Sequence, residues 1–239
     1  MAENTTLQKI ADVYESNPTI RALIQVAMSP IPYGIGSAID TALTTKIENM
    51  REERLKTFFN ELANGSIELT EDVIQKEDFL HAYFSTLKAA VNTHKKEKIR
   101  LFARLLSTAT KEKYLGTDIF DEFLDILDNL SIRELQILLI LKYFEDAHPH
   151  KTNENGEMEN DMQRAVRFWD NFETEVEAKC GLGTEELRAA LNRLNRTGFY
   201  ETLTGYLETT GGKGKLSPVF SQFAQWIQAK SENLTNSSS

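Results

Sequence analysis

Apolar residues recur at intervals of three and four along most of the chain, which is the spacing of amphipathic α-helices rather than of β-strands. The longest such pattern runs from Gly36 to Ala63 and stops at Asn64-Gly65, a typical end for a helix. Its apolar positions are Ile39, Leu43, Ile47, Met50, Phe58, Phe59 and Leu62. A helix of this length also offers a seam for a second copy, so we expect a homodimer through the N-terminal helices.

Three shorter helical patterns follow the long one. They cover residues 79–91, 99–109 and 118–128, and the last has an apolar side opposite a side rich in Asp and Glu. Together with the long helix they predict an α-helical bundle over residues 1–129 as the first of two domains.

An uncharged stretch from Ala22 to Ile39 needs a separate interpretation. Pro30 and Pro32 interrupt it, and an interior proline breaks a helix at a cost of about 3 kcal/mol, so the stretch is not expected to span a membrane. We interpret it as a buried helical hairpin. The alternative is a membrane-active or stress-defence effector, in which this hairpin leaves the bundle and inserts into lipid.

A second domain is predicted to begin at residue 130. Ser131 and Glu134 form a capping box directly ahead of a leucine-rich helical pattern. Residues 146–161 have no apolar period and are expected to form an exposed, mobile insertion. The domain is predicted to end at residue 232, and the polar tail 233–239 is expected to be disordered.

The region after the insertion has the pattern of two helices joined by a tight turn. A helical stripe over 162–176 ends at Cys180-Gly181-Leu182-Gly183, and Thr184 is the expected N-cap of the helix that follows. The apolar side of this helix consists of Leu187, Leu191 and Leu194. Its opposite side carries Arg188, Asn192, Asn195 and Arg196.

Beyond Gly198 the pattern changes to that of a short β-hairpin and a closing helix. Residues 199–204 are rich in β-formers, 211–214 are rich in glycine, and Ser217-Pro218 marks a helix start. The order of elements, with residues 187–194 running into Thr197-Gly198-Phe199-Tyr200, resembles the winged helix-turn-helix family over about 130–230. The fold expected is therefore mostly α, a helical bundle followed by a winged-helix-like domain with a small β-hairpin.

The resemblance implies a surface for a partner. In winged-helix proteins the third helix commonly enters the major groove and the wing contacts the backbone. Carried over to this chain, the binding residues are Arg188, Asn192, Asn195, Arg196, Lys213 and Lys215. Residues 181–215 contain five basic and four acidic side chains, so two kinds of partner stay open, double-stranded DNA and another protein.

A secondary basic face is predicted on the helix over 99–109. Residues 95–113 contain seven basic and two acidic side chains, and Lys96, Arg100 and Arg104 follow one another at four-residue steps. This face suits phosphate or anionic lipid, and equally suits a solvated flank that pairs with the acidic helix beside it.

The remaining features argue against catalysis. The four histidines and the single Cys180 give no closed ligand set and no nucleophile with a base beside it, so we expect no metal, no cofactor and no enzyme. The net charge of −9 favours protein partners, and the polar residues after Met1 favour a cytoplasmic location. The sequence thus predicts a non-enzymatic regulatory or adaptor protein.

Overall fold

The computed structural model describes residues 38–64, 73, 76–152, 155–203 and 212–227. The predicted tail 233–239 lies outside the described residues. So does the predicted hairpin, apart from the backbone of its last two residues, 38 and 39. The chain divides into two compact units, Met1–Asp128 and Asn129–Ser239, and the predicted boundary lies one residue further along. The described residues are mostly helical and include one small antiparallel strand pair, which confirms the mostly α class.

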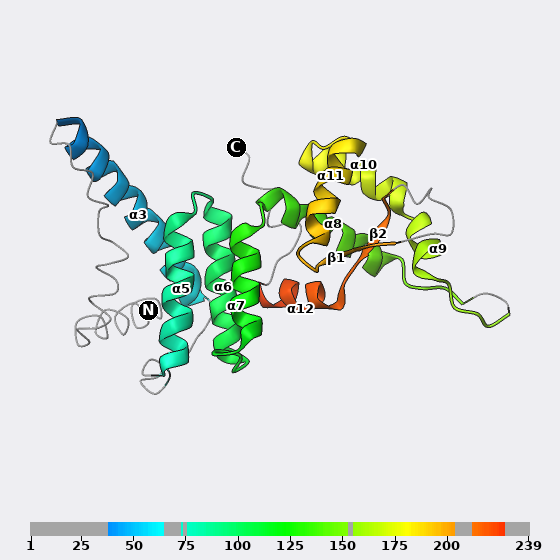
Figure 1. Cartoon of the computed structure of the whole chain (residues 1–239), viewed down its shortest axis with the longest axis horizontal. Coiled ribbons are helices and arrows are strands. Elements are labelled where there is room, and N and C mark those ends of the chain that lie inside the picture. The colour runs from blue at the N-terminus through cyan, green and yellow to red at the C-terminus, as the bar shows by residue number, and fades with distance from the viewer. Residues whose placement is uncertain (1–37, 65–72, 74–75, 153–154, 204–211, 228–239) are drawn as a thin grey trace. The chain divides into compact units, whose positions relative to one another are not determined.

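The first unit contains four described helices (Figure 1). They are α3 (Ala38–Asn64), α5 (Glu77–Asn92), α6 (Lys96–Lys111) and α7 (Asp118–Asn129). Helix α3 packs against both α5 and α6, which also pack against each other. The four predicted helical patterns of this unit are all present as helices.

Large apolar side chains fill the centre of the first unit. Phe58 of α3, Phe102 of α6 and Phe123 of α7 have no exposed surface. Each side chain of this size stabilises the fold by about 2–3 kcal/mol through burial alone. One cation is also buried: Lys98 of α6, whose Nζ donates to the Asp128 carbonyl oxygen at 2.5 Å. That bond ties α6 to the end of α7.

The second unit is built from five described helices and two strands. In chain order they are α8 (Ile132–Ala147), α9 (Asp161–Val166), α10 (Trp169–Cys180), α11 (Thr184–Asn195), β1 (Tyr200–Thr202), β2 (Gly214–Leu216) and α12 (Pro218–Trp226). The strands pair antiparallel, with Tyr200 opposite Leu216, as the predicted hairpin requires. Strand β1 packs on α11, whereas β2 packs on α8 and α9.

Of the two helix starts predicted in this unit at Ser131 and Thr184, the structure confirms the first and corrects the second. The predicted capping box at Ser131 is present, because the Glu134 amide donates to Ser131 Oγ at 3.1 Å and the Ser131 amide donates to the Glu134 carboxylate at 3.0 Å. The prediction of Thr184 as N-cap is wrong, since Gly183 occupies that position and Thr184 is the first helical residue. The Gly183 amide donates to the Glu186 carboxylate at 3.1 Å, so this side chain completes the cap.

The single helical stripe predicted over 162–176 is two helices. Helix α9 ends at Val166 and α10 begins at Trp169, with a break at Arg167 and Phe168. The break buries Phe168 and leaves Val166 60% exposed, although Val166 belongs to the predicted apolar stripe.

The two strands pack closely against each other at Gly214. A Cβ atom at this position would lie 2.1–2.5 Å from three atoms of the Tyr200 side chain of β1, so only glycine fits. The Tyr200 hydroxyl donates to the Gly212 carbonyl oxygen at 2.7 Å. Phe199, which precedes β1, contacts Phe223 of α12 with ring centroids 4.6 Å apart and ring planes 36° apart.

Candidate functional site

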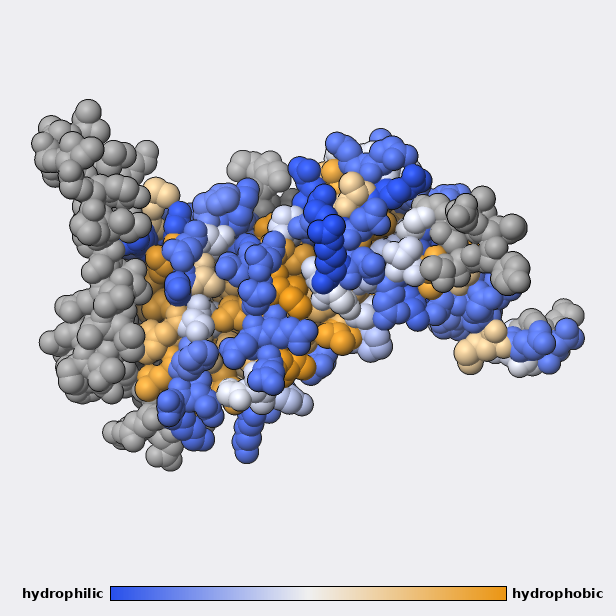
Figure 2. Space-filling model, viewed as in Figure 1, coloured by the Kyte–Doolittle hydropathy of each residue, from blue (hydrophilic) through white to orange (hydrophobic). Residues whose placement is uncertain are grey.

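The exposed side of α11 is formed as its sequence pattern requires. Leu187, Leu191 and Leu194 are buried, and the four polar residues predicted to meet a partner are all exposed. They are Arg188, Asn192, Asn195 and Arg196, which we call the α11 face. Figure 2 shows hydrophilic side chains over α10 and α11 in this view.

Arg188 sits where the α11 face meets the strand pair. Its guanidinium forms an ion pair with Glu185, one turn earlier, at 3.4 Å. A Cβ atom at Gly212 would lie 3.5 Å from the Arg188 Cγ, so the aliphatic part of Arg188 packs beside this glycine. The backbone of Gly212 has a φ of +80°, which favours glycine.

The two predicted lysines of the wing differ in their surroundings. Lys215 Nζ lies 2.8 Å from Asp161 Oδ2 of α9 and 3.6 Å from Glu201 Oε2 of β1. The hydrogen bond between Lys215 and Asp161 lowers the pKa of Asp161 and raises the pKa of Lys215. Lys213 is half-buried, and its carbonyl oxygen accepts from the Leu203 amide at 2.9 Å. Lys215 is therefore tied to α9 rather than presented together with the α11 face.

A further arginine of α11 also pairs within the unit. Arg193 Nε donates to Glu134 Oε1 at 2.8 Å, which connects α11 to the first turn of α8. Burial acts to raise the pKa of Glu134, but hydrogen bonds from Ser131 and Arg193 lower it below its ordinary value. Glu185 and Glu186 are both exposed at the start of α11. The surface around α11 thus has mixed charge.

Sequence reasoning missed a polar cluster at the base of the predicted insertion. Residues 146–147 belong to α8 and residue 161 to α9, and we call the described residues between them, 148–152 and 155–160, the arm. Thr152 and Met158 form an isolated antiparallel bridge across it. Figure 1 shows the arm running away from the helices of its own unit. Thr152 and Met158 are both exposed, as the sequence predicts for the insertion.

Two arginines hold the base of the arm, Arg164 of α9 and Arg167 of the break that follows this helix. Arg164 donates to the carbonyl oxygens of His148 at 2.8 Å and Glu145 at 2.7 Å. Arg167 binds both carboxylate oxygens of Glu159, at 2.9 and 2.8 Å, and also donates to the Pro149 carbonyl oxygen at 2.7 Å. The base of the arm is therefore held by directed bonds, and the expected mobility of the insertion stays a prediction.

Glu145 connects this cluster to the strand pair. Its side chain is 13% exposed, accepts from the Leu216 amide at 2.9 Å, and lies 3.8 Å from the Arg164 guanidinium. Burial raises the pKa of Glu145, and the bonds from Leu216 and Arg164 only partly offset that effect. No local sequence pattern predicts this cluster, because the partners come from α8, the arm, α9 and β2.

The secondary basic face of the first unit is not continuous. Lys96 and Arg100 are exposed, but Arg104 Nε donates to Glu61 Oε1 of α3 at 2.6 Å, and both side chains are largely buried. The prediction that Arg104 extends the face of Lys96 and Arg100 is therefore wrong. Four-residue steps drift around the helix by about 40° each, which turns the third residue of the series toward α3.

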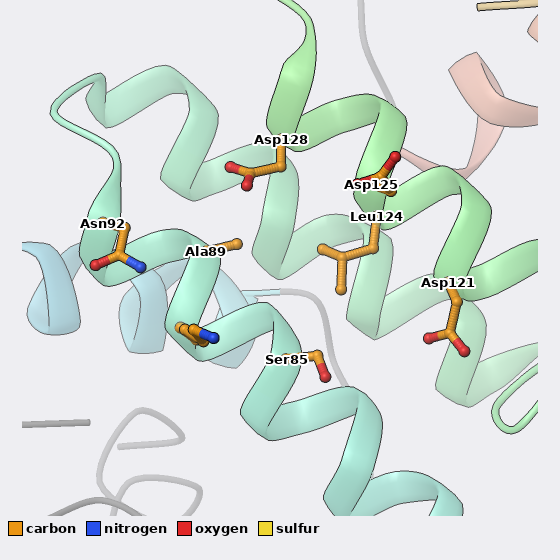
Figure 3. A pocket seen from close by; sticks show the side chains of 8 residues that line it. Ser85, Ala89, Asn92, Asp121, Leu124, Asp125 and Asp128 are labelled. Atoms are coloured by element: carbon orange, nitrogen blue, oxygen red, sulfur yellow. The ribbon is translucent and has the colours of Figure 1, made fainter. Parts of the chain in front are cut away.

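A groove of about 290 Å³ lies between α5 and α7 of the first unit. Figure 3 shows Ala89 and Leu124 facing each other across it. Its polar lining consists of Ser85, Lys88, Asn92, Asp121, Asp125 and Asp128. Three aspartates against one lysine make this concavity unfavourable for an anion.

Among the described residues there is no group of three or more His, Cys, Asp or Glu side chains that could hold a metal ion. Cys180 is buried at the end of α10, and burial raises the pKa of its thiol. In the part of the chain that the structure describes, no helix is long and apolar enough to cross a membrane.

Neither a family model, nor a curated protein, nor a solved structure matches this chain.

Proposed function

We propose that the chain is a non-enzymatic regulatory or adaptor protein whose second unit is a winged-helix-like module that binds a protein through the α11 face. The order of elements supports the module, since three helical segments precede α11, a strand pair follows it, and α12 closes the unit. In the proposed module α9 and α10 together stand for the second helix, α11 is the third helix that meets a partner, and the strand pair is the wing.

The observation that carries the choice of a protein over duplex DNA is the pairing of Lys215 with Asp161 and Glu201. A protein that binds duplex DNA gains most of its affinity from cations that neutralise phosphates. In this unit the wing lysine is engaged by two carboxylates, and Arg188 of α11 is engaged by Glu185. Releasing these cations toward phosphates would leave carboxylates facing the DNA.

The residue types of the α11 face suit a protein partner. Arginine is enriched in protein interfaces, where its guanidinium packs on apolar surface and donates several hydrogen bonds. Arg196 and Asn192 are both exposed, and Glu185 and Glu186 add acceptors beside them. A mixed surface of this kind recognises complementary side chains on a protein more readily than a uniformly negative duplex.

Two measurements test the proposal. In the first, the full chain is titrated against pooled labelled duplexes between low and physiological salt, and we expect no binding that weakens with salt. Binding that falls steeply with salt and is lost in Arg188→Ala with Arg196→Ala would assign the α11 face to DNA instead.

In the second, a photo-crosslinking residue replaces Asn192, and the matched control carries it at Asn171, an exposed asparagine of α10. We expect a discrete protein adduct at position 192 in cells, unaffected by nuclease and weakened by Arg196→Ala. Equal adducts at both positions would show that the α11 face has no special role.

The membrane-active alternative rests on residues 22–39, and the structure describes only the backbone of the last two of these. No structural observation favours it. Flotation of the full chain with anionic vesicles, abolished by Ile24→Glu, would promote this alternative above the adaptor.

A further inference from the structure

His150 lies at the point where the arm, α9 and the strand pair are connected. Its Nδ1 is 2.9 Å from the Glu159 carbonyl oxygen, and its Nε2 is 3.3 Å from Asp161 Oδ1. The other oxygen of that carboxylate, Asp161 Oδ2, accepts from Lys215 Nζ of β2 at 2.8 Å. A continuous path therefore runs from the arm through His150 and Asp161 to the wing.

Both ring nitrogens of His150 thus face oxygen acceptors. A carbonyl oxygen and an ionised carboxylate can only accept hydrogen bonds, whereas a neutral imidazole has a single N–H. The neutral ring can donate to Glu159 or to Asp161 but not to both, and its second nitrogen then presents a lone pair to an acceptor. The protonated ring satisfies both contacts.

A donor for the neutral ring lies close by. Arg164 NH1 is 3.5 Å from His150 Nε2, slightly further than Asp161 Oδ1. A neutral ring that keeps its proton on Nδ1 can accept from Arg164 at Nε2. Gain or loss of one proton therefore decides whether Nε2 bonds to Asp161 or to Arg164.

The charges around His150 come from every element packed near it. Asp161 and Arg164 belong to α9, Glu159 to the arm, Lys215 to β2, and Glu145 to α8 beside Arg164. The hydrogen bond from Lys215 lowers the pKa of Asp161, so this carboxylate stays ionised where imidazoles titrate. It is thus available to the protonated ring.

We propose that His150 is a proton-operated latch that fastens the arm to α9 and, through Asp161 and Lys215, to strand β2. Protonation of the ring closes the latch, because the protonated ring donates to Glu159 and Asp161 together. In the neutral ring Nε2 instead accepts from Arg164, and the link from the arm to Asp161 opens. The latch does not depend on which partner the α11 face binds.

The direct test is nitrogen NMR of the histidine rings in the full chain. Across a pH titration we expect the neutral ring of His150 to carry its proton on Nδ1 and none on Nε2, and the charged ring to carry a proton on both. The side-chain carboxyl carbon of Asp161 should shift with the same midpoint as His150. A neutral ring protonated on Nε2, or an Asp161 signal that does not follow His150, would overturn the proposal.

A second readout measures the latch in the backbone. The Glu159 amide donates to the Lys151 carbonyl oxygen at 2.8 Å across the base of the arm. We expect its hydrogen exchange, corrected for intrinsic rates, to be about two- to fivefold slower at pH 5.5 than at pH 8, as for other partly exposed ion pairs. His150→Gln should abolish this difference, and His94→Gln, an exposed histidine of the first unit, should leave it unchanged. A pH dependence that survives in His150→Gln would contradict the latch.

Discussion

The α11 face and the base of the arm use the same kinds of side chain in opposite ways. On α11, Arg188 pairs with Glu185 three residues away, and 47% of the Arg188 side chain is exposed. At the base of the arm, Arg164 bonds to a residue 19 positions away, and its side chain is only 16% exposed. Local exposed pairs add little to stability, whereas directed bonds across the chain hold elements together. The base of the arm therefore contributes to the stability of the fold, whereas the α11 face contributes little to it and stays exposed.

The largest effect is expected from Arg164→Ala. The substitution removes a donor from the carbonyl oxygens of His148 and Glu145, of which the Glu145 oxygen still accepts from the His148 amide, and it removes the cation beside the buried Glu145 carboxylate. We expect a loss of about 2–3 kcal/mol of unfolding free energy. The measurement is urea unfolding followed by tryptophan fluorescence, because both tryptophans, Trp169 and Trp226, belong to the second unit.

The matched control for that experiment is Arg196→Ala on the α11 face. Its side chain is exposed at the end of α11, so the expected change is within about 0.5 kcal/mol. Equal losses in the two variants would remove the contrast between the two regions.

A somewhat smaller effect is expected from Gly214→Ala, which acts on the strand pair through shape instead of charge. The added methyl group would overlap the Tyr200 ring, which is buried and bonded to Gly212, so the strand pair must shift. We expect a loss of about 1–3 kcal/mol that does not change with salt. A loss that changes with salt would show that charge, not the shape of the Gly214 contact, holds the two strands together.

Lys215→Ala should cost less, about 0.5 kcal/mol, because Lys215 and Asp161 are each one-third exposed. The loss should shrink in high salt, as measured by urea midpoints at low and high ionic strength. Lys213→Ala is the neighbouring control and is expected to show no such salt dependence. A salt-independent loss in Lys215→Ala would indicate that its aliphatic chain, not its charge, supports β2.

The smallest effect concerns pH. Burial raises the pKa of Glu145 above its ordinary value of 4.5, so the folded chain holds this proton more tightly than the unfolded chain does. The unfolding free energy contributed by Glu145 therefore declines as pH rises through the interval just above 4.5. Asp161 and Glu134 have lowered pKa values, so their contribution is instead lost as pH falls through those values.

Glu145→Gln should flatten the decline above pH 4.5 and leave the loss at lower pH in place, as read from urea midpoints across pH. If the unfolding free energy of the variant declines as steeply with pH as that of the original chain, a group other than Glu145 causes the decline.

The parts of the fold that the sequence predicts are those set by neighbours along the chain. The capping box at Ser131 and the buried leucines of α11 follow from residues three or four positions apart. The break at Phe168 is different, because the helical period continues through it and only packing in three dimensions reveals that Val166 faces solvent.

The same distinction between near and distant sequence neighbours applies to the candidate site. Exposure of Arg188 and Asn192 follows from the helical period alone, once the buried side of α11 is known. The partner of Lys215 lies 54 residues away, and the partner of Arg104 lies 43 residues away. Charge counts cannot reveal such pairs, since an exposed and a paired cation look identical in a sequence. The proton path through His150 was invisible for the same reason.

The buried position of Cys180 lets a labelling rate report local opening of the second unit. This is the only cysteine of the chain, it is buried at the end of α10, and the turn behind it begins at Gly181 with a φ of +65°. Because the thiol is buried and its pKa is raised, a maleimide should react with it slowly in the folded unit. The rate of single-site labelling therefore measures how often the end of α10 opens, next to the start of α11.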